Sequence, residues 1–241
     1  MTATDLFKAG QLDEAVQALG VELRSNPTDI KRRTFLFELL CFSGEYDRAE
    51  KQLDILADSN KEAAMGSLLY RSALQAERTR RRMFEAGDFP HGEAPPVGGE
   101  MDDRQVESME DADPRLGARL EVYAAGAYLW IPYEHIAAVE IQAPARLRDL
   151  LWIPAMLHTS PAFKGRELGE VLLPVLTPLA FKHHDPDVRL GRQTVWQESA
   201  DGYALPAGQK MFLADDEEYP ILEVRSLQFT APLGAPDEQQ S

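Results

Sequence analysis

The chain has 241 residues, of which 44% are hydrophobic and 27% are charged, with 16 glycines, 16 prolines and one cysteine. This balance excludes a collagen-like, coiled-coil or wholly disordered chain, and the length suits one large or two smaller domains. The single Cys41 excludes an intramolecular disulfide and a multi-thiolate metal site. The sequence starts without a basic, then apolar, leader and has no apolar run of about 18 residues, so we expect a cytoplasmic protein.

The net charge of −15 is unevenly distributed. Residues 1–83 carry 13 basic and 13 acidic side chains, residues 84–113 carry one basic and ten acidic, and residues 114–241 carry 11 basic and 17 acidic. An acidic surface repels a phosphate polymer, because nucleic-acid binding depends on cationic groups. We therefore expect no nucleic-acid partner.

A repeat with a period of 34 residues opens the chain. Residues 6–15 align with residues 40–49, and the matched positions include Gly10 with Gly44 and Ala15 with Ala49. In each copy the glycine suits a left-handed helix cap and the alanine permits two helices to approach closely. A period of 34 residues is typical of tetratricopeptide repeats, each a pair of helices.

A third copy is degenerate, because Arg78 stands where a glycine is expected. Residues 61–84 still have apolar side chains at helical spacing, so we predict one closing helix there. We take residues 1–84 as a tetratricopeptide-like helical domain. Two repeats and one helix bury little core alone, and something else must pack against them.

The next segment, residues 85–113, is predicted to be an acidic linker. Residues 87–100 are crowded with glycine and proline and show no periodicity. We expect the paired carboxylates, Asp102 with Asp103 and Asp111 with Asp113, to be solvated or to cap local structure.

Residues 114–241 are predicted to form a β-rich domain with little helix. Short apolar runs alternate there with turn signals, which is typical of antiparallel strands. The predicted strands cover residues 120–124, 127–132, 137–141, 150–156, 169–175, 193–197, 209–213 and 221–229. The fold class is therefore α+β, with helical repeats packed on a mostly antiparallel β domain.

Catalytic motifs are absent, and the sequence contains no nucleophile elbow, phosphate-binding glycine loop, zinc-protease helix or dinucleotide fingerprint. His183, His184 and Asp187 are the one group of potential metal ligands close in sequence, but adjacent loop residues rarely converge on one ion. We expect no enzyme, cofactor or metal. A metal-dependent enzyme or regulator using these three residues is the alternative.

The repeat predicts a binding groove lined by its first helices. Such grooves accept extended peptides or amphipathic helices, and the residues facing this one are predicted to be Phe7, Lys8, Lys31, Thr34, Glu38, Cys41 and Phe42. Phe7 and Phe42 are the expected apolar anchors. The alternative is that the β domain itself fills the groove, and the sequence does not choose between the two.

Several motifs resemble the ImpE family, also called TagJ or SciE. They are Asp-Ala-Asp-Pro-Arg-Leu-Gly at residues 111–117, Leu-Arg-Asp-Leu-Leu-Trp-Ile-Pro-Ala at residues 147–155, and Leu-Glu-Val-Arg at residues 222–225. The resemblance extends over nearly the whole chain and makes residues 114–241 an ImpE-type domain. We expect its polar and turn positions to be mainly structural: Asp111, Asp113, Pro114, Arg115, Gly117, Asp149, Trp152 and Pro154.

The resemblance implies a non-enzymatic adaptor encoded with type VI secretion systems. Members of this family are expected to bind an N-terminal helix of the small contractile-sheath subunit, TssB or VipA, and to be linked to the sheath-recycling ATPase ClpV. The motif itself leaves open which surface binds the partner, and Arg115 is expected to pair with Asp111 or Asp113.

Overall fold

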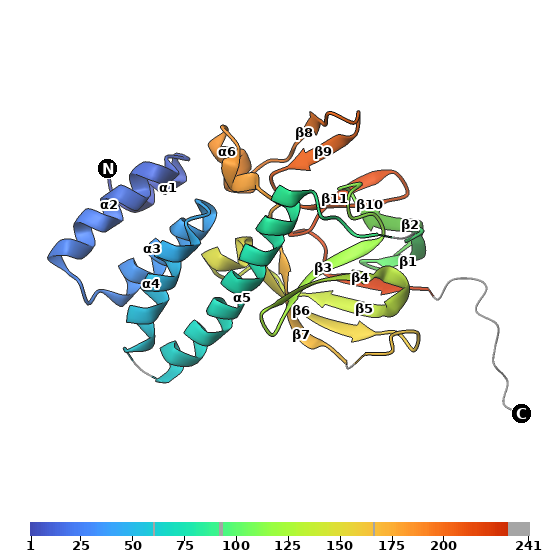
Figure 1. Ribbon diagram of the computed structural model, residues 1–241, viewed down its shortest axis with the longest axis horizontal. Coiled ribbons are helices and arrows are strands. Elements are labelled where there is room, and N and C mark those ends of the chain that lie inside the picture. Colours follow the sequence, from blue (N-terminus) through green and yellow to red (C-terminus); the bar gives the residue numbers. More distant parts are fainter. Residues whose placement is uncertain (60, 92–93, 166, 231–241) are drawn as a thin grey trace, which may run out of the picture.

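A computed structural model describes residues 1–59, 61–91, 94–165 and 167–230. The protein is α+β, with five helices at its N-terminal end packed beside a curled antiparallel sheet (Figure 1). The last eleven residues of the β-rich domain predicted for 114–241 lie outside the described part of the chain.

The first four helices form two hairpins: α1 (Ala3–Lys8) with α2 (Leu12–Ser25), and α3 (Ile30–Phe42) with α4 (Tyr46–Ala57). Thr2 begins α1 with a capping box that it shares with Asp5. Gly10 and Gly44 end α1 and α3 with φ of +78° and +70°, as the repeat predicts. Only glycine adopts this backbone region without a steric cost, so the aligned glycines set both turns.

The closing helix is α5 (Lys61–Ala86), which confirms the helix predicted over 61–84. It packs against α4 on one side and against the sheet on the other, so it joins the two parts of the molecule (Figure 1). Among the described helices, none combines the length and apolar character that crossing a bilayer requires.

The main sheet has ten strands, and every pairing in it is antiparallel. Its spatial order is β11-β10-β2-β1-β12-β5-β6-β7-β3-β4. The strands are β1 (Val97–Met101), β2 (Arg104–Asp111), β3 (Arg119–Ala124), β4 (Ala127–Pro132), β5 (Ile136–Ile141), β6 (Trp152–Thr159), β7 (Gly169–Pro174), β10 (Met211–Ala214), β11 (Glu217–Pro220) and β12 (Ser226–Phe229).

Smaller elements complete the β-rich part. A separate hairpin, β8 (Val195–Glu198) with β9 (Ala204–Ala207), stands apart from the main sheet near α6 (Pro186–Arg189), as Figure 1 shows. The described residues also form short 3-10 helices, which are η1 (Tyr133–His135), η2 (Leu147–Leu150) and η3 (Ala180–Lys182).

Most of the predicted strands are present, with ends shifted by a few residues. The strand expected at 221–229 is wrong in its first half, because β11 ends at Pro220 and the chain turns before β12. The β9 strand was missing from the prediction, since its four residues include Pro206 and lack a clear apolar alternation.

The expected acidic linker at 85–113 is wrong in its second half, where β1 and β2 form a hairpin inside the main sheet. Val97, Met101, Val106 and Met109 are buried, while the acidic side chains between them mostly point outward. Asp102 lies at the hairpin turn, and its carboxylate accepts hydrogen bonds from the Arg225 and Ser226 amides. High charge therefore concealed an alternating strand pattern.

Candidate functional site

The β-rich part covers the groove predicted on the helical repeat. The side chains of Glu38, Cys41 and Phe42 are buried, and Phe42 is only 1% exposed. One apolar cluster combines these helices with Leu151, Trp152 and other side chains of the sheet region. The prediction that Phe42 and Glu38 face an external partner is therefore wrong, because the protein itself occupies that surface.

The other residues predicted to line the groove differ in their exposure to solvent. Phe7 is half-buried, and its ring contacts Phe35 and Phe42 at centroid distances of 5.8 and 6.3 Å. Lys8 and Lys31 are exposed, and Thr34 is half-buried with its hydroxyl donating to a carbonyl one turn earlier in α3. These four residues do not form one continuous open groove with Phe42.

Aromatic and charged side chains join the helices to the sheet beneath this surface. The Trp152 ring of β6 lies 6.2 Å from Tyr70 of α5 and 6.5 Å from Phe37 of α3. Arg148 of η2 lies over the Tyr70 ring and contacts the Glu38 carboxylate at 3.3 Å. The contact around Trp152 is thus apolar, and the ion pair of Arg148 with Glu38 lies beside it.

Burial raises the pKa of Glu38 to about 7, although the nearby Arg148 guanidinium opposes the shift. The pKa of Glu38 is thus higher in the folded protein, at about 7, than its ordinary value of 4.5. The fold therefore loses stability as the pH rises between these two values, because the buried carboxyl must ionise. We therefore expect Glu38→Gln to gain stability relative to the wild type by about 1–3 kcal/mol between pH 5 and pH 8. Urea unfolding of both proteins at each pH measures this difference.

Glu45→Gln is the control for that experiment, because the Glu45 carboxylate pairs with Arg48 on the surface. Its stability difference from the wild type is expected to stay level over the same pH range. A level difference for Glu38→Gln as well would contradict the assignment of a raised pKa to this carboxyl.

A network of buried charges joins α5 to the centre of the sheet. Glu121 of β3 accepts two hydrogen bonds from the Arg80 guanidinium, at 2.7 and 2.8 Å. Lys210 bridges the carboxylates of Glu121 and Asp111, and Tyr128 donates its hydroxyl to Glu121. Two cations thus meet two carboxylates, and all four charged side chains are nearly inaccessible to solvent.

The protonation of this network follows from its burial. Burial favours a neutral Glu121, but Arg80 and Lys210 outweigh it and hold the pKa of that carboxyl below its usual range. Asp111 has a single cationic neighbour, so burial raises its pKa to about 6. Of the two expectations for Asp111, solvation is wrong, because β10 brings Lys210 against the buried carboxylate. Capping of local structure is present, since the same carboxylate accepts a hydrogen bond from the Asp113 amide at 2.9 Å.

The Asp-Ala-Asp-Pro-Arg-Leu-Gly motif forms a tight turn between β2 and β3. Asp113 is buried, and its carboxylate accepts from the Arg115 side chain at 2.8 and 2.5 Å, which is one of the two pairings predicted for Arg115. The same guanidinium lies over the rings of Phe84 and Phe89. Pro114 and Gly117 complete this turn, which therefore holds the end of α5 against the sheet.

The second motif serves a comparable structural purpose. Asp149 is buried and caps η2 by accepting from the Ala145 and Arg146 amides at 2.9 and 2.8 Å. Trp152 is buried and donates from its indole nitrogen to Glu77 of α5 at 3.2 Å. Pro154 follows on the same face of β6 and lies at an open surface.

The segment containing His183, His184 and Asp187 lies against the first helical hairpin. Within the residues that the structure describes, no three histidine, cysteine, aspartate or glutamate side chains gather as a metal site. His183 instead accepts a hydrogen bond from the Asp185 amide, and Asp187 pairs with Arg192. Arg192 also donates to the main-chain carbonyls of residues 7 and 8 at the end of α1.

An apolar groove lies between α5 and the sheet, away from the covered surface. Its cavity volume is about 300 Å³, and its wall comes from Leu69, Ser72 and Ala73 of α5. Its floor is built by the outward-facing side chains of neighbouring strands, which include Pro154, Met156 and Leu172. The apolar side chains at helical spacing predicted over residues 61–84 include Leu69, but the sequence did not reveal this groove.

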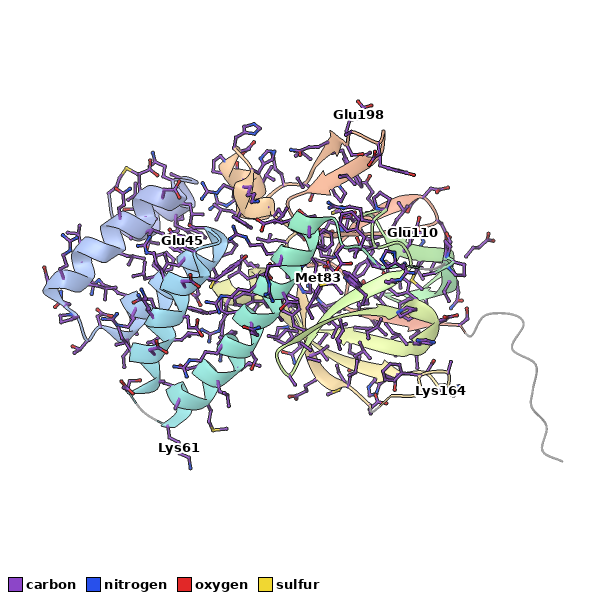
Figure 2. All side chains as sticks on the ribbon, viewed as in Figure 1. Glu45, Lys61, Met83, Glu110, Lys164 and Glu198 are labelled. Carbon is purple, nitrogen blue, oxygen red and sulfur yellow. The ribbon has the colours of Figure 1, made fainter. Side chains whose placement is uncertain are left out.

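Exposed apolar side chains continue the groove along α5. Met65 is 70% exposed, Leu68 is 66% exposed and Leu69 is 50% exposed, all near the start of the helix. Figure 2 shows Lys61 at the end of α5 that extends away from the sheet, whereas Met83 lies beside it. The first turns of α5 thus present an apolar stripe that the sheet leaves uncovered.

The sequence has clear relatives. A family model described as ImpE protein matches residues 103–228, more than half of the chain. The chain belongs to the ImpE family. It is also 33% identical, over 95% of its length and 91% of the relative, to the type VI secretion system accessory component TagJ of Pseudomonas aeruginosa. This ImpE-family member is therefore related to a secretion accessory component along nearly its whole length.

A solved structure shares the complete fold. The crystal structure of protein VPA1032 from Vibrio parahaemolyticus superimposes with a TM-score of 0.82, covering 96% of this chain and 98% of that one at 23% sequence identity. The fold is thus shared with another protein over nearly the whole length of both chains.

Proposed function

We propose that this protein is a non-enzymatic cytoplasmic adaptor of a type VI secretion system. It binds the N-terminal helix of the small contractile-sheath subunit, TssB or VipA, and links that subunit to the ATPase ClpV. The observation that carries this proposal is the 33% identity to a type VI secretion accessory component over nearly the entire chain.

Two features of the architecture support a binding function. The two helical hairpins follow a 34-residue offset in the sequence, the period of tetratricopeptide repeats, which commonly present surfaces to peptides and helices. The exposed apolar stripe at the start of α5 offers a surface that a partner's apolar face can cover. The buried charges at the centre of the molecule are already paired with one another and act in holding its parts together.

The test is binding of the purified protein to the sheath small subunit from the same secretion system. We expect the two to elute together in size-exclusion chromatography, and a subunit lacking its first helix to elute separately. Equal co-elution of the truncated subunit would contradict binding through that helix. A full-length subunit that never co-elutes would contradict the adaptor function itself.

A further inference from the structure

We infer that the groove between α5 and the sheet binds an amphipathic helix that carries basic side chains beside its apolar stripe. This inference rests on the proposed function, because it places the partner's helix on a particular surface of this protein. The groove is lined by α5 from Leu69 to Ala73, by β6 and β7, and by the turn between β3 and β4.

The wall of the groove has the geometry of one half of a helix pair. Leu69 and Ser72 line the groove, and Met65 and Leu68 lie three or four residues before them on the same face of α5, outside the lining itself. Farther along this face Ser72 approaches the turn that joins β3 to β4. A partner helix that lies alongside the N-terminal turns of α5 could therefore pack its side chains between those on this face, as paired helices commonly do.

The floor of the groove explains why a helix fits better than an extended strand. Met156 pairs across the sheet with Glu140 on one side and Glu170 on the other, while Pro154 pairs with Leu172 in the neighbouring row. These side chains project from the sheet face, and their strands already have hydrogen-bonded neighbours on both sides. An added strand would find no free edge there, whereas a helix packs on such a face with its side chains.

The charges beside the groove indicate the character of the bound helix. Glu140 and Glu170 are exposed and flank Met156 on the floor. On α5 the nearby Arg71 guanidinium contacts Asp54 of α4, so its charge is already paired. The open surface beside the apolar floor is therefore acidic, and lysine or arginine residues along the partner helix would complement it.

The experiment uses the full chain and a fluorescently labelled synthetic peptide of the sheath small subunit's N-terminal helix, with affinity measured by anisotropy. We expect Leu68→Glu and Leu69→Glu each to weaken binding at least about tenfold, because a charge replaces an apolar anchor. Val21→Glu is the matched control, since Val21 is 59% exposed on α2, and its affinity is expected to stay within about twofold of the wild type.

A second pair of variants tests the charge complementarity. Glu140→Lys and Glu170→Lys are both surface changes and are expected to weaken binding about three- to tenfold at low salt, with the difference shrinking as salt is added. Unchanged affinity in these two variants would overturn the basic character that we assign to the partner helix. Circular dichroism spectra matching the wild type confirm that each variant is folded.

The outcomes separate this inference from the function on which it rests. Wild-type binding that all groove variants retain would overturn the groove and leave the adaptor function standing. A wild-type protein that binds no peptide would overturn both. Self-association of the free protein that Leu68→Glu abolishes would overturn the inference by making a second copy the occupant of the groove.

Discussion

Replacing Glu121 with glutamine is expected to lower the free energy of unfolding by about 3–5 kcal/mol, because the change leaves buried cations short of a partner. The Glu121 carboxylate accepts from Arg80 and Lys210, and all three side chains are buried. Glutamine keeps the shape of the side chain but cannot balance their charge. Urea denaturation followed by circular dichroism measures the loss.

The pH dependence of that loss has a definite sign. The pKa of Glu121 is held below its ordinary value of 4.5, so its ionised form stabilises the fold above that pH and less as the pH falls through the folded-state value. The difference between the wild type and Glu121→Gln is therefore expected to shrink in acid. A difference that grows between pH 6 and pH 3 would contradict the pairing.

Two comparisons identify the buried network as the cause. Glu45→Gln removes an exposed partner of Arg48 and is expected to cost less than about 1 kcal/mol. The double variant with Arg80→Met and Glu121→Gln is expected to lose less free energy of unfolding than the two single variants added together. In each single variant one buried charge loses its partner, whereas in the double variant both of these charges are gone. Additive losses would indicate that the two side chains act independently.

The helices were predictable because their signals are local. Gly10 and Gly44 end their helices where the 34-residue repeat places them, and α5 follows the apolar spacing of residues 61–84. Most strands were also evident from short apolar runs separated by turn signals. The hairpin of β1 and β2 was concealed because acidic side chains alternate with its few buried positions.

The covered surface of the repeat was not predictable in the same way. Helical spacing puts Glu38 and Phe42 on one side of α3, but it does not reveal what packs against that side. The covering residues Arg148 and Trp152 come from η2 and β6, more than one hundred positions later. The pairing of Arg80 with Glu121 likewise joins α5 to β3, and each residue alone has the appearance of an ordinary surface charge.

Replacing Gly44 with alanine is expected to lower the free energy of unfolding by about 2–4 kcal/mol, through backbone strain and steric overlap together. Gly44 has φ of +70°, and a Cβ there would lie 2.5 Å from the Phe181 ring. That ring also packs against Tyr46 and Arg81, so it has little room to move. The same urea titration gives the size of the loss.

Gly87 supplies a matched control, because it has the same φ of +70° and no atom within 4 Å of a Cβ at that position. Gly87→Ala carries the backbone strain alone and is expected to cost only about 1–2 kcal/mol. Adding Phe181→Ala to Gly44→Ala is expected to recover about 1–2 kcal/mol relative to the sum of the single changes, because the overlap disappears. Equal losses at the two glycines, with no recovery in the double variant, would show that η3 does not hold the turn between α3 and α4.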